Sequence, residues 1–440
     1  MTSISPISAP FVPTIPKGVS AGTAAGQKAS ISADPTFLGL PRKLTQDEID
    51  NMELRGADLR GFDLSGLDLS GRDLTGANLS GAVLDRANFD GAILTDALLE
   101  NVSLDGASFV DADLSGATIT GRINPPRLDG TYATREQDER FNKNVDFSGA
   151  NLSGAKLSRI YFEDSTFRGA NFAGAELDVA FVASDVRDAD FSNTEGSIRF
   201  GLFETYLDGR TTDVRGAKFD GADLQGLSFE NVDARDVDLS RARIERIRIT
   251  GGNIDGLKFP DENPEYLNFT DVDLRQTDVD KFKDFSRVRF TQVNVAGLNF
   301  DGADFTDAWL RFSSNEDRNS VTRINGLEIP AVGPDALDET SFKGANFSNA
   351  YFTSNKDAVL KAENFSGALF SGAGLSEIAF DDFSKVDLRF TLIENSDLRN
   401  ADRETLEGFR RIAGSNLDGI EFEGLDLSRL GGDLGNLTGF

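Results

Sequence analysis

The stretch LRGADLRGFDLSGLDLSGRDLTGANLSG (residues 54–81) carries an apolar side chain at every fifth position. Within it, Ala77 and Leu79 are apolar and enclose one polar residue, which is the alternation of a short strand. The next small apolar residue is Ala82, so the chain must turn between units, and the pair Ser80-Gly81 suits such a turn. A short strand and a turn, repeated many times, predict a solenoid.

The five-residue period also predicts which side chains fill the interior of the coil. Each unit contributes one large centre, Leu or Phe, and often an Ala two positions earlier. The centres run in phase from Leu54 to Ile119 and return in later runs with changes of phase. Small inward Ala residues leave room for the large centres in a narrow interior. The residues that we expect in this core include Leu54, Leu59, Leu64, Leu69, Leu74, Leu79, Phe89, Phe109, Phe172, Leu224, Phe305 and Phe347.

Several units, such as Ala150-Asn151-Leu152, Ala222-Asp223-Leu224 and Ala345-Asn346-Phe347, closely resemble the pentapeptide-repeat family. The pattern of that family is Ala, then Asp or Asn, then Leu or Phe, followed by two variable residues. The resemblance covers roughly three quarters of the chain, in many in-phase units. It implies an all-β fold, a right-handed quadrilateral parallel β-helix with four units in each coil.

Breaks in the period divide the chain into segments. Residues 1–43 are poor in charge and rich in Ser, Thr, Ala, Gly and Pro, which is typical of a disordered leader. Thr45 and Glu48 have capping-box spacing, so we expect a short helix that covers the first coil. This capping helix is predicted over 44–53. A β-helix follows over 54–312, with interruptions near 121–144 and 192–213. After it we expect a loop insertion over 313–341 and further repeats over 342–440, which include a helical insertion near 402–413 and a C-terminal cap. An oligomer contact through a coil end is the alternative interpretation of that cap.

The composition excludes several classes of site. The chain of 440 residues has no His and no Cys, so Ser-His-Asp triads, Cys-His pairs, disulfides and thiolate or histidine metal sites cannot form. We therefore expect no catalytic residues, no metal and no cofactor. No apolar run reaches about 18 residues, so no transmembrane segment is predicted. The net charge of −28 argues against nucleic acid as a direct ligand.

Two features are candidate contacts with a protein partner. Trp309, the sole Trp, occupies an outward position between Ala308 and Leu310. A basic run, Arg241, Arg243, Arg246 and Arg248, also falls at outward positions. This run has a second interpretation, in which Arg243 neutralises Asp223 in the preceding coil across adjacent strands.

These observations favour a non-catalytic bacterial protein that presents an acidic β-helix and its loops to a protein partner. The leader resembles the export signals of type III secreted effectors, which predicts export by a route other than Sec; the alternative is a cytoplasmic protein. A rival function is DNA mimicry, as in the gyrase-protecting members of the family that confer quinolone resistance. A third alternative is a polysaccharide-active β-helix that uses carboxylates.

Overall fold

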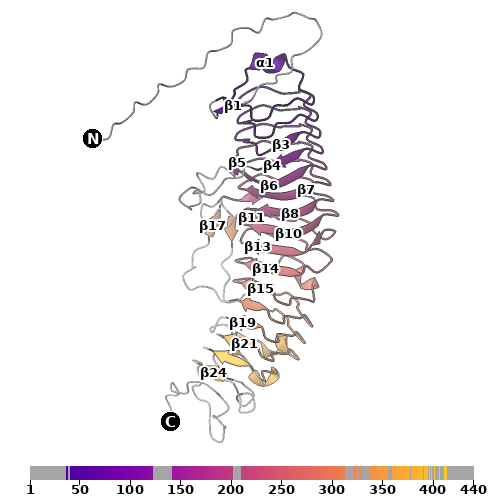
Figure 1. Cartoon of the computed structure of the whole chain (residues 1–440). Coiled ribbons are helices and arrows are strands. Elements are labelled where there is room, and N and C mark those ends of the chain that lie inside the picture. Colours follow the sequence, from indigo (N-terminus) through magenta and orange to yellow (C-terminus); the bar gives the residue numbers. More distant parts are fainter. Residues whose placement is uncertain are drawn as a thin grey trace, which may run out of the picture.

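The structure, a computed structural model, is a curved rod of stacked coils (Figure 1). The residues that it describes are 36–37, 40–121, 141–201, 210–312, 322–324, 327–329, 337, 339–354, 359–376, 378–389, 391–394, 396, 398, 401, 406 and 411–413. The rod runs from helix α1 (Gln46–Asp50) at one end to strand β24 (Arg411–Ala413) toward the other.

Each five-residue unit is a short extended segment closed by a turn. The N–H of Ala77 donates to the carbonyl of Leu74 over 2.9 Å, which closes the turn that contains Gly76. Gly76 has φ of +65°, a value that favours glycine. The N–H of Leu59 donates to the carbonyl of Asn78 in the next coil over 2.8 Å. Turns thus bond within the unit, while extended residues bond between coils.

One regular coil contains four units, because Asp58 pairs with Asn78 and Asp63 with Val83, in each case four units further along the chain. The all-β parallel β-helix predicted from the sequence is confirmed. Within the described residues, one face is a parallel sheet of 16 strands, which we call the main sheet. Its strands are β3 (Leu98–Glu100), β4 (Thr118–Thr120), β5 (Phe141–Lys143), β6 (Lys156–Glu163), β7 (Glu176–Val182), β8 (Glu195–Phe200), β10 (Asp223–Glu230), β12 (Arg243–Ile244), β13 (Arg246–Thr250), β14 (Tyr266–Thr270), β15 (Arg289–Thr291), β16 (Trp309–Arg311), β19 (Tyr351–Thr353), β21 (Gly374–Ser376), β23 (Leu392–Glu394) and β24.

Shorter elements complete the described residues. Two small parallel pairs are β9 (Thr212–Asp213) with β11 (Val232–Asp233), and β20 (Val359–Leu360) with β22 (Ala379–Phe380). Two antiparallel pairs are β1 (Thr36–Phe37) with β2 (Leu40–Pro41), and β17 (Thr322–Ile324) with β18 (Leu327–Ile329). Three 3-10 turns are η3 (Val279–Lys281), η4 (Ala362–Phe365) and η5 (Phe383–Lys385).

The interior is filled by the centres of the units. All twelve core residues expected from the sequence are at most 2% exposed. Aromatic centres form stacks along the rod: the ring of Phe347 lies 5.1 Å from that of Phe305 and 4.7 Å from that of Phe370, nearly parallel to both. Offset ring stacking adds to the hydrophobic stabilisation of such a core.

The three largest insertions lengthen their coils without breaking the stack. Thr118 pairs with Lys156, which lies well beyond the end of one regular coil. Asp185 likewise pairs with Asp213, and Asn299 with Ser341, across longer stretches than four units. The predicted interruption near 192–213 is too wide, because Glu195–Phe200 form β8 and Phe200 is fully buried. Most of the other two insertions, over 121–144 and 313–341, lies outside the described residues.

The N-terminal end carries the capping helix suggested by the sequence. The Thr45 hydroxyl accepts from the N–H of Glu48, and the Glu48 carboxylate accepts from the N–H of Thr45 over 2.9 Å. Ile49 is fully buried against the first coil. The predicted leader over 1–43 extends too far, since β1 and β2 form before the helix and Lys43 pairs with Asp63. Residues 1–35 lie outside the described residues.

The predicted helical insertion over 402–413 extends too far toward the C-terminus. Leu406 is helical and buried, but Arg411–Ala413 form β24, which pairs in parallel with β23 and continues the main sheet. Ile412 pairs with Ile393, a residue that is fully buried in the interior. The helical spacing that includes Ile412 is therefore overridden there by stacking on the preceding coil. The predicted cap beyond residue 413 lies outside the described residues.

Candidate functional site

The candidate functional residues of this rod lie on its surface and not in its interior. In the ranges that the structure describes, no group of three or more Asp or Glu side chains is arranged to hold a metal ion. None of the helices in these ranges is long and apolar enough to cross a membrane. The remaining candidates are outward side chains on the main sheet, where parallel strands place residues of successive coils in register.

Trp309 lies at an outward position of β16, as its sequence neighbours suggested. Its side chain is 46% exposed, while the adjacent Leu310 is fully buried. Its ring lies 4.5 Å from that of Tyr351, the residue opposite it on β19, with an interplanar angle of 27°. The pair forms an aromatic platform that the surrounding sheet holds in place.

The four Arg residues of the predicted basic run are all exposed, but they have different surroundings. Arg241 forms an ion pair with Asp220 at 2.5 Å. Arg243 forms an inter-strand ion pair with Asp223 at 2.9 Å, as in the second interpretation of the basic run. Arg246 donates from Nε to the carbonyl of Gln225 over 3.3 Å. Arg248 has no ion pair with any residue in the described part of the chain.

The main sheet brings Arg248 and Trp309 into one line of outward residues, which we call the basic–aromatic strip. Pairing aligns Arg248 with Asn268, Asn268 with Arg289, and Arg289 with Trp309. At about 4.8 Å per strand, Trp309 lies about 14 Å along the sheet from Arg248. The full strip consists of Arg199, Ser228, Arg248, Asn268, Arg289, Trp309 and Tyr351, from β8, β10, β13, β14, β15, β16 and β19.

A groove of about 280 Å³ lies at the N-terminal end of this strip. Its floor lies over β7, β8 and β10, where Ala180, Ser197 and Gly226 have small side chains or none. Larger side chains stand around this floor and make its walls. The walls include Tyr161, Asp178, Arg199, Arg246, Arg248 and Tyr266.

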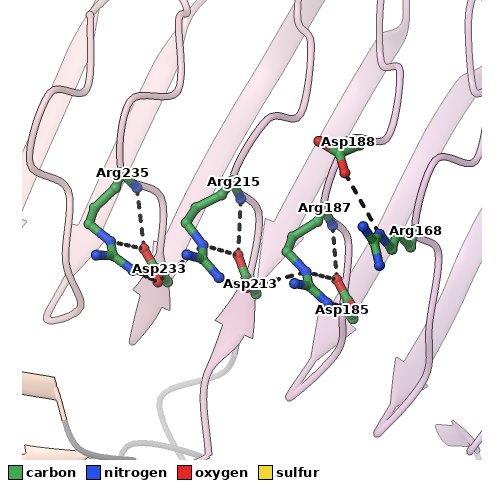
Figure 2. A network of polar contacts seen from close by, with 8 residues as sticks. All are labelled: Arg168, Asp185, Arg187, Asp188, Asp213, Arg215, Asp233 and Arg235. Atoms are coloured by element: carbon green, nitrogen blue, oxygen red, sulfur yellow. Dashed lines mark hydrogen bonds and ion pairs between the residues drawn. The ribbon is translucent and has the colours of Figure 1, made fainter.

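A separate face carries a ladder of ion pairs (Figure 2). In each rung an Asp binds the Arg two residues later: the Asp213 carboxylate accepts from Arg215 Nε over 2.9 Å and from its backbone N–H over 3.2 Å. The rungs are also joined, since Arg187 Nε lies 3.5 Å from Asp213. The Arg187 side chain lowers the pKa of Asp185 by hydrogen bonding, and Asp185 raises the pKa of Arg187 in turn. The three rungs are Asp185–Arg187, Asp213–Arg215 and Asp233–Arg235.

The ladder is a structural feature, because its charges neutralise one another. The Arg residues of the strip differ: Arg199, Arg248 and Arg289 show no carboxylate partner within the described residues, although the chain has 73 acidic residues. Among the described residues, the Arg side chains of the strip thus lack the neutralising carboxylates that each rung of the ladder has.

Sequence reasoning missed Tyr161, Arg199, Tyr266, Arg289 and Tyr351. A spacing of one coil in the sequence could have indicated that these residues are neighbours, but the number of residues in a coil varies along the chain. The coil that joins Asn268 to Arg289 is longer than a regular one, and an insertion intervenes between Trp309 and Tyr351. Only the pairing register places Tyr161, Arg199, Arg289 and Tyr351 in one line, and Tyr266 in the neighbouring line opposite Arg246.

Several solved structures are similar to parts of this chain, whereas none of the curated proteins matches it. One is HetL from the cyanobacterium Nostoc, a pentapeptide repeat protein involved in heterocyst differentiation regulation, with 18% identity over 66% of this chain and 88% of that chain (TM-score 0.18). Another is the plasmid-mediated fluoroquinolone resistance protein QnrB1, with 19% identity over 50% of this chain and 88% of that chain (TM-score 0.24). A thylakoid lumen pentapeptide repeat protein of Arabidopsis thaliana has 28% identity over 31% of this chain and 72% of that chain (TM-score 0.12).

These structural scores are low, and the repeats themselves decide the family. The family model of pentapeptide repeats matches in 8 copies, over residues 53–91, 82–121, 146–180, 213–251 and 284–313. These matches coincide with the stacked five-residue units of the β-helix. Over these residues the chain matches the pentapeptide-repeat family.

Proposed function

We propose that this protein is a non-catalytic scaffold that binds a protein partner through the basic–aromatic strip. The observation that carries the proposal is the alignment of Arg248, Arg289, Trp309 and Tyr351 on one face of a rigid sheet. Arg and aromatic side chains dominate the energetics of protein interfaces, and their strands hold them before the partner arrives. A preorganised platform lowers the entropy cost of binding.

The proposal gives separate roles to the predicted contact residues. Trp309 and Arg248 contact the partner directly. Arg241 and Arg243 hold their carboxylate partners on the rod and contribute little to binding, because both are already paired. Arg246 contributes through the part of its guanidinium that does not bond the Gln225 carbonyl.

The test is affinity capture from bacterial and host lysates in parallel, with the full chain as bait. Trp309→Ala removes the aromatic platform, and Leu369→Ala is the matched control, an apolar residue that is 52% exposed and lies outside the main sheet. A protein captured by the parent and by Leu369→Ala, but lost with Trp309→Ala, supports the proposal. We expect its purified affinity to fall at least about 30-fold on loss of a hot-spot Trp. Equal capture by all three baits contradicts it.

The same experiment separates the narrower versions of this function. A host protein that depends on Trp309 favours an exported effector, and a reporter fused to residues 1–43 then tests export directly. Recovery of a bacterial topoisomerase favours gyrase protection instead. In that case the purified chain should change gyrase supercoiling or its inhibition by quinolones.

A further inference from the structure

The groove beside the strip is deep because the residues that form its floor are small. The strip bears mostly long outward side chains, but Ala180, Ser197 and Gly226 stand close together on β7, β8 and β10. Pairing places Ser197 directly opposite Gly226. These small residues lie between Tyr161 on β6 and Arg246 on β13. The hollow therefore belongs to the rigid sheet and does not depend on a loop.

The walls of the groove are cationic on a strongly anionic molecule. Three of the lining residues are Arg (Arg199, Arg246 and Arg248) and one is acidic, Asp178. Arg199 and Arg248 are exposed and form no ion pair with any described residue. Elsewhere on the rod Arg241 and Arg243 each bind a nearby Asp. The groove is thus a place where the rod attracts carboxylates instead of repelling them.

The spacing of the cations fits a particular backbone. Arg199 and Arg248 occupy the same outward line and are two strands apart, on β8 and β13, which is about 10 Å at the strand spacing of a sheet. In a polyproline II helix, side chains three residues apart lie on one side and are about 9 Å apart. Two Tyr side chains, Tyr161 and Tyr266, line the groove as aromatic residues line known polyproline II sites.

We propose that this groove binds an acidic segment of the partner protein in the polyproline II conformation. Carboxylates three residues apart bind Arg199 and Arg248, and the backbone between them runs beside Ser228, on the side where Ser197 and Gly226 form the floor of the groove. Guanidinium groups suit this role because they bind carboxylates through two parallel hydrogen bonds. The inference rests on the proposed function, since it specifies the chemistry of that partner.

The test uses a labelled peptide with Glu at every third position and Pro between, and a matched peptide with Gln in place of Glu. Binding is measured by fluorescence anisotropy to the full chain, to the double variant Arg199→Gln/Arg248→Gln, and to the control Arg241→Gln/Arg243→Gln, which removes the same charge. We expect the double variant to lose at least about 30-fold in affinity, as for two charge-assisted contacts. The control variant should keep the affinity of the parent, and the Gln peptide should bind as weakly as the double variant.

Three results would overturn the inference: equal losses in the two double variants, equal binding of the Glu and Gln peptides, or displacement of the peptide by inorganic phosphate at an equal concentration of anion. The last result would indicate a site for small oxyanions. Trp309→Ala should leave peptide binding unchanged, because Trp309 does not line the groove. If the peptide fails to bind while partner capture still depends on Trp309, only this inference fails. If the peptide binds but capture ignores Trp309, the proposed function fails instead.

Discussion

Replacing Asp213 by Ala should destabilise the β-helix by about 2 kcal/mol, whereas replacing it by Asn should cost only about 1 kcal/mol. Asp213 makes two kinds of contact. Its carboxylate accepts a hydrogen bond from the backbone N–H of Arg215, and it forms ion pairs with the side chains of Arg215 and Arg187 (Figure 2). Alanine removes both contacts, and Asn removes only the charge.

The magnitudes follow from the exposure of each group. The Asp213 side chain is 23% exposed and the Arg215 side chain 41%, so solvent screens their attraction. We therefore assign about 0.5 kcal/mol to each ion pair, and about 1 kcal/mol to the backbone hydrogen bond. Asparagine can replace the acceptor, since Asn171 at the equivalent position of its own unit accepts from the N–H of Ala173 over 2.9 Å.

The assay is equilibrium urea unfolding of the full chain at about 0.1 M and about 1 M NaCl, at which the Debye length falls from about 10 Å to about 3 Å. The difference between parent and Asp213→Asn should close at high salt, while about 1 kcal/mol should remain for Asp213→Ala. Asp220→Ala serves as a control, because within the described residues its side chain pairs with Arg241 alone, and it is 51% exposed. Equal losses of unfolding free energy for Asp213→Asn and Asp213→Ala at both salt concentrations would refute the separation into an ion-pair contribution and a backbone hydrogen-bond contribution.

Three further predictions concern the core, the turns and acid stability. Phe347→Ala should cost about 3 to 5 kcal/mol in urea unfolding, and Phe347→Leu much less, because the ring fills the stack between two coils; similar losses would argue against tight packing there. Gly252→Ala should cost at least about 1 kcal/mol more than Gly76→Ala, because a Cβ at Gly252 would lie 2.4 Å from the Val232 carbonyl oxygen, while Gly76 faces open space; equal melting temperatures would contradict this. Hydrogen bonds from Ser240 and Lys258 lower the pKa of Asp238 to about 2, below the value of 3.8 expected for the unfolded chain, so its contribution is present above about pH 4 and is lost as the pH falls toward 2. Asp238→Asn should therefore flatten the acid side of the stability profile, and an unchanged profile would exclude this contribution.

The interior of the rod could be predicted from the sequence because its rule is local. Leu59 and Leu79 are recognisable as centres from their own neighbours, and the capping box needs only Thr45 and the nearby Glu48. The pair Arg243–Asp223 could be predicted for the same reason, because no insertion separates these two units and the coil between them has the regular length.

The strip and the groove could not be predicted because their rule is long-range. Tyr351 pairs with Trp309 across an insertion, so their separation in the sequence is much longer than one regular coil. Arg289 pairs with Asn268 because the coil between them is longer than a regular one. In β6, the irregularity between Ser158 and Ile160 lets Arg159 take φ of +52° and shifts the register by one residue. A shift of one residue exchanges inward and outward side chains, so a five-residue count cannot carry the outward pattern across it.

This division between inward and outward residues makes the proposed surface testable. The neighbours Phe290, Leu310 and Phe352 are at most 1% exposed and hold β15, β16 and β19 in register. Trp309 lies on the opposite side of the same sheet and adds little to that core. Its replacement should leave the fold intact, because backbone pairing and the buried centres do not use the indole. A loss of binding in Trp309→Ala, with the circular dichroism and melting temperature of the parent, would therefore report recognition and not unfolding.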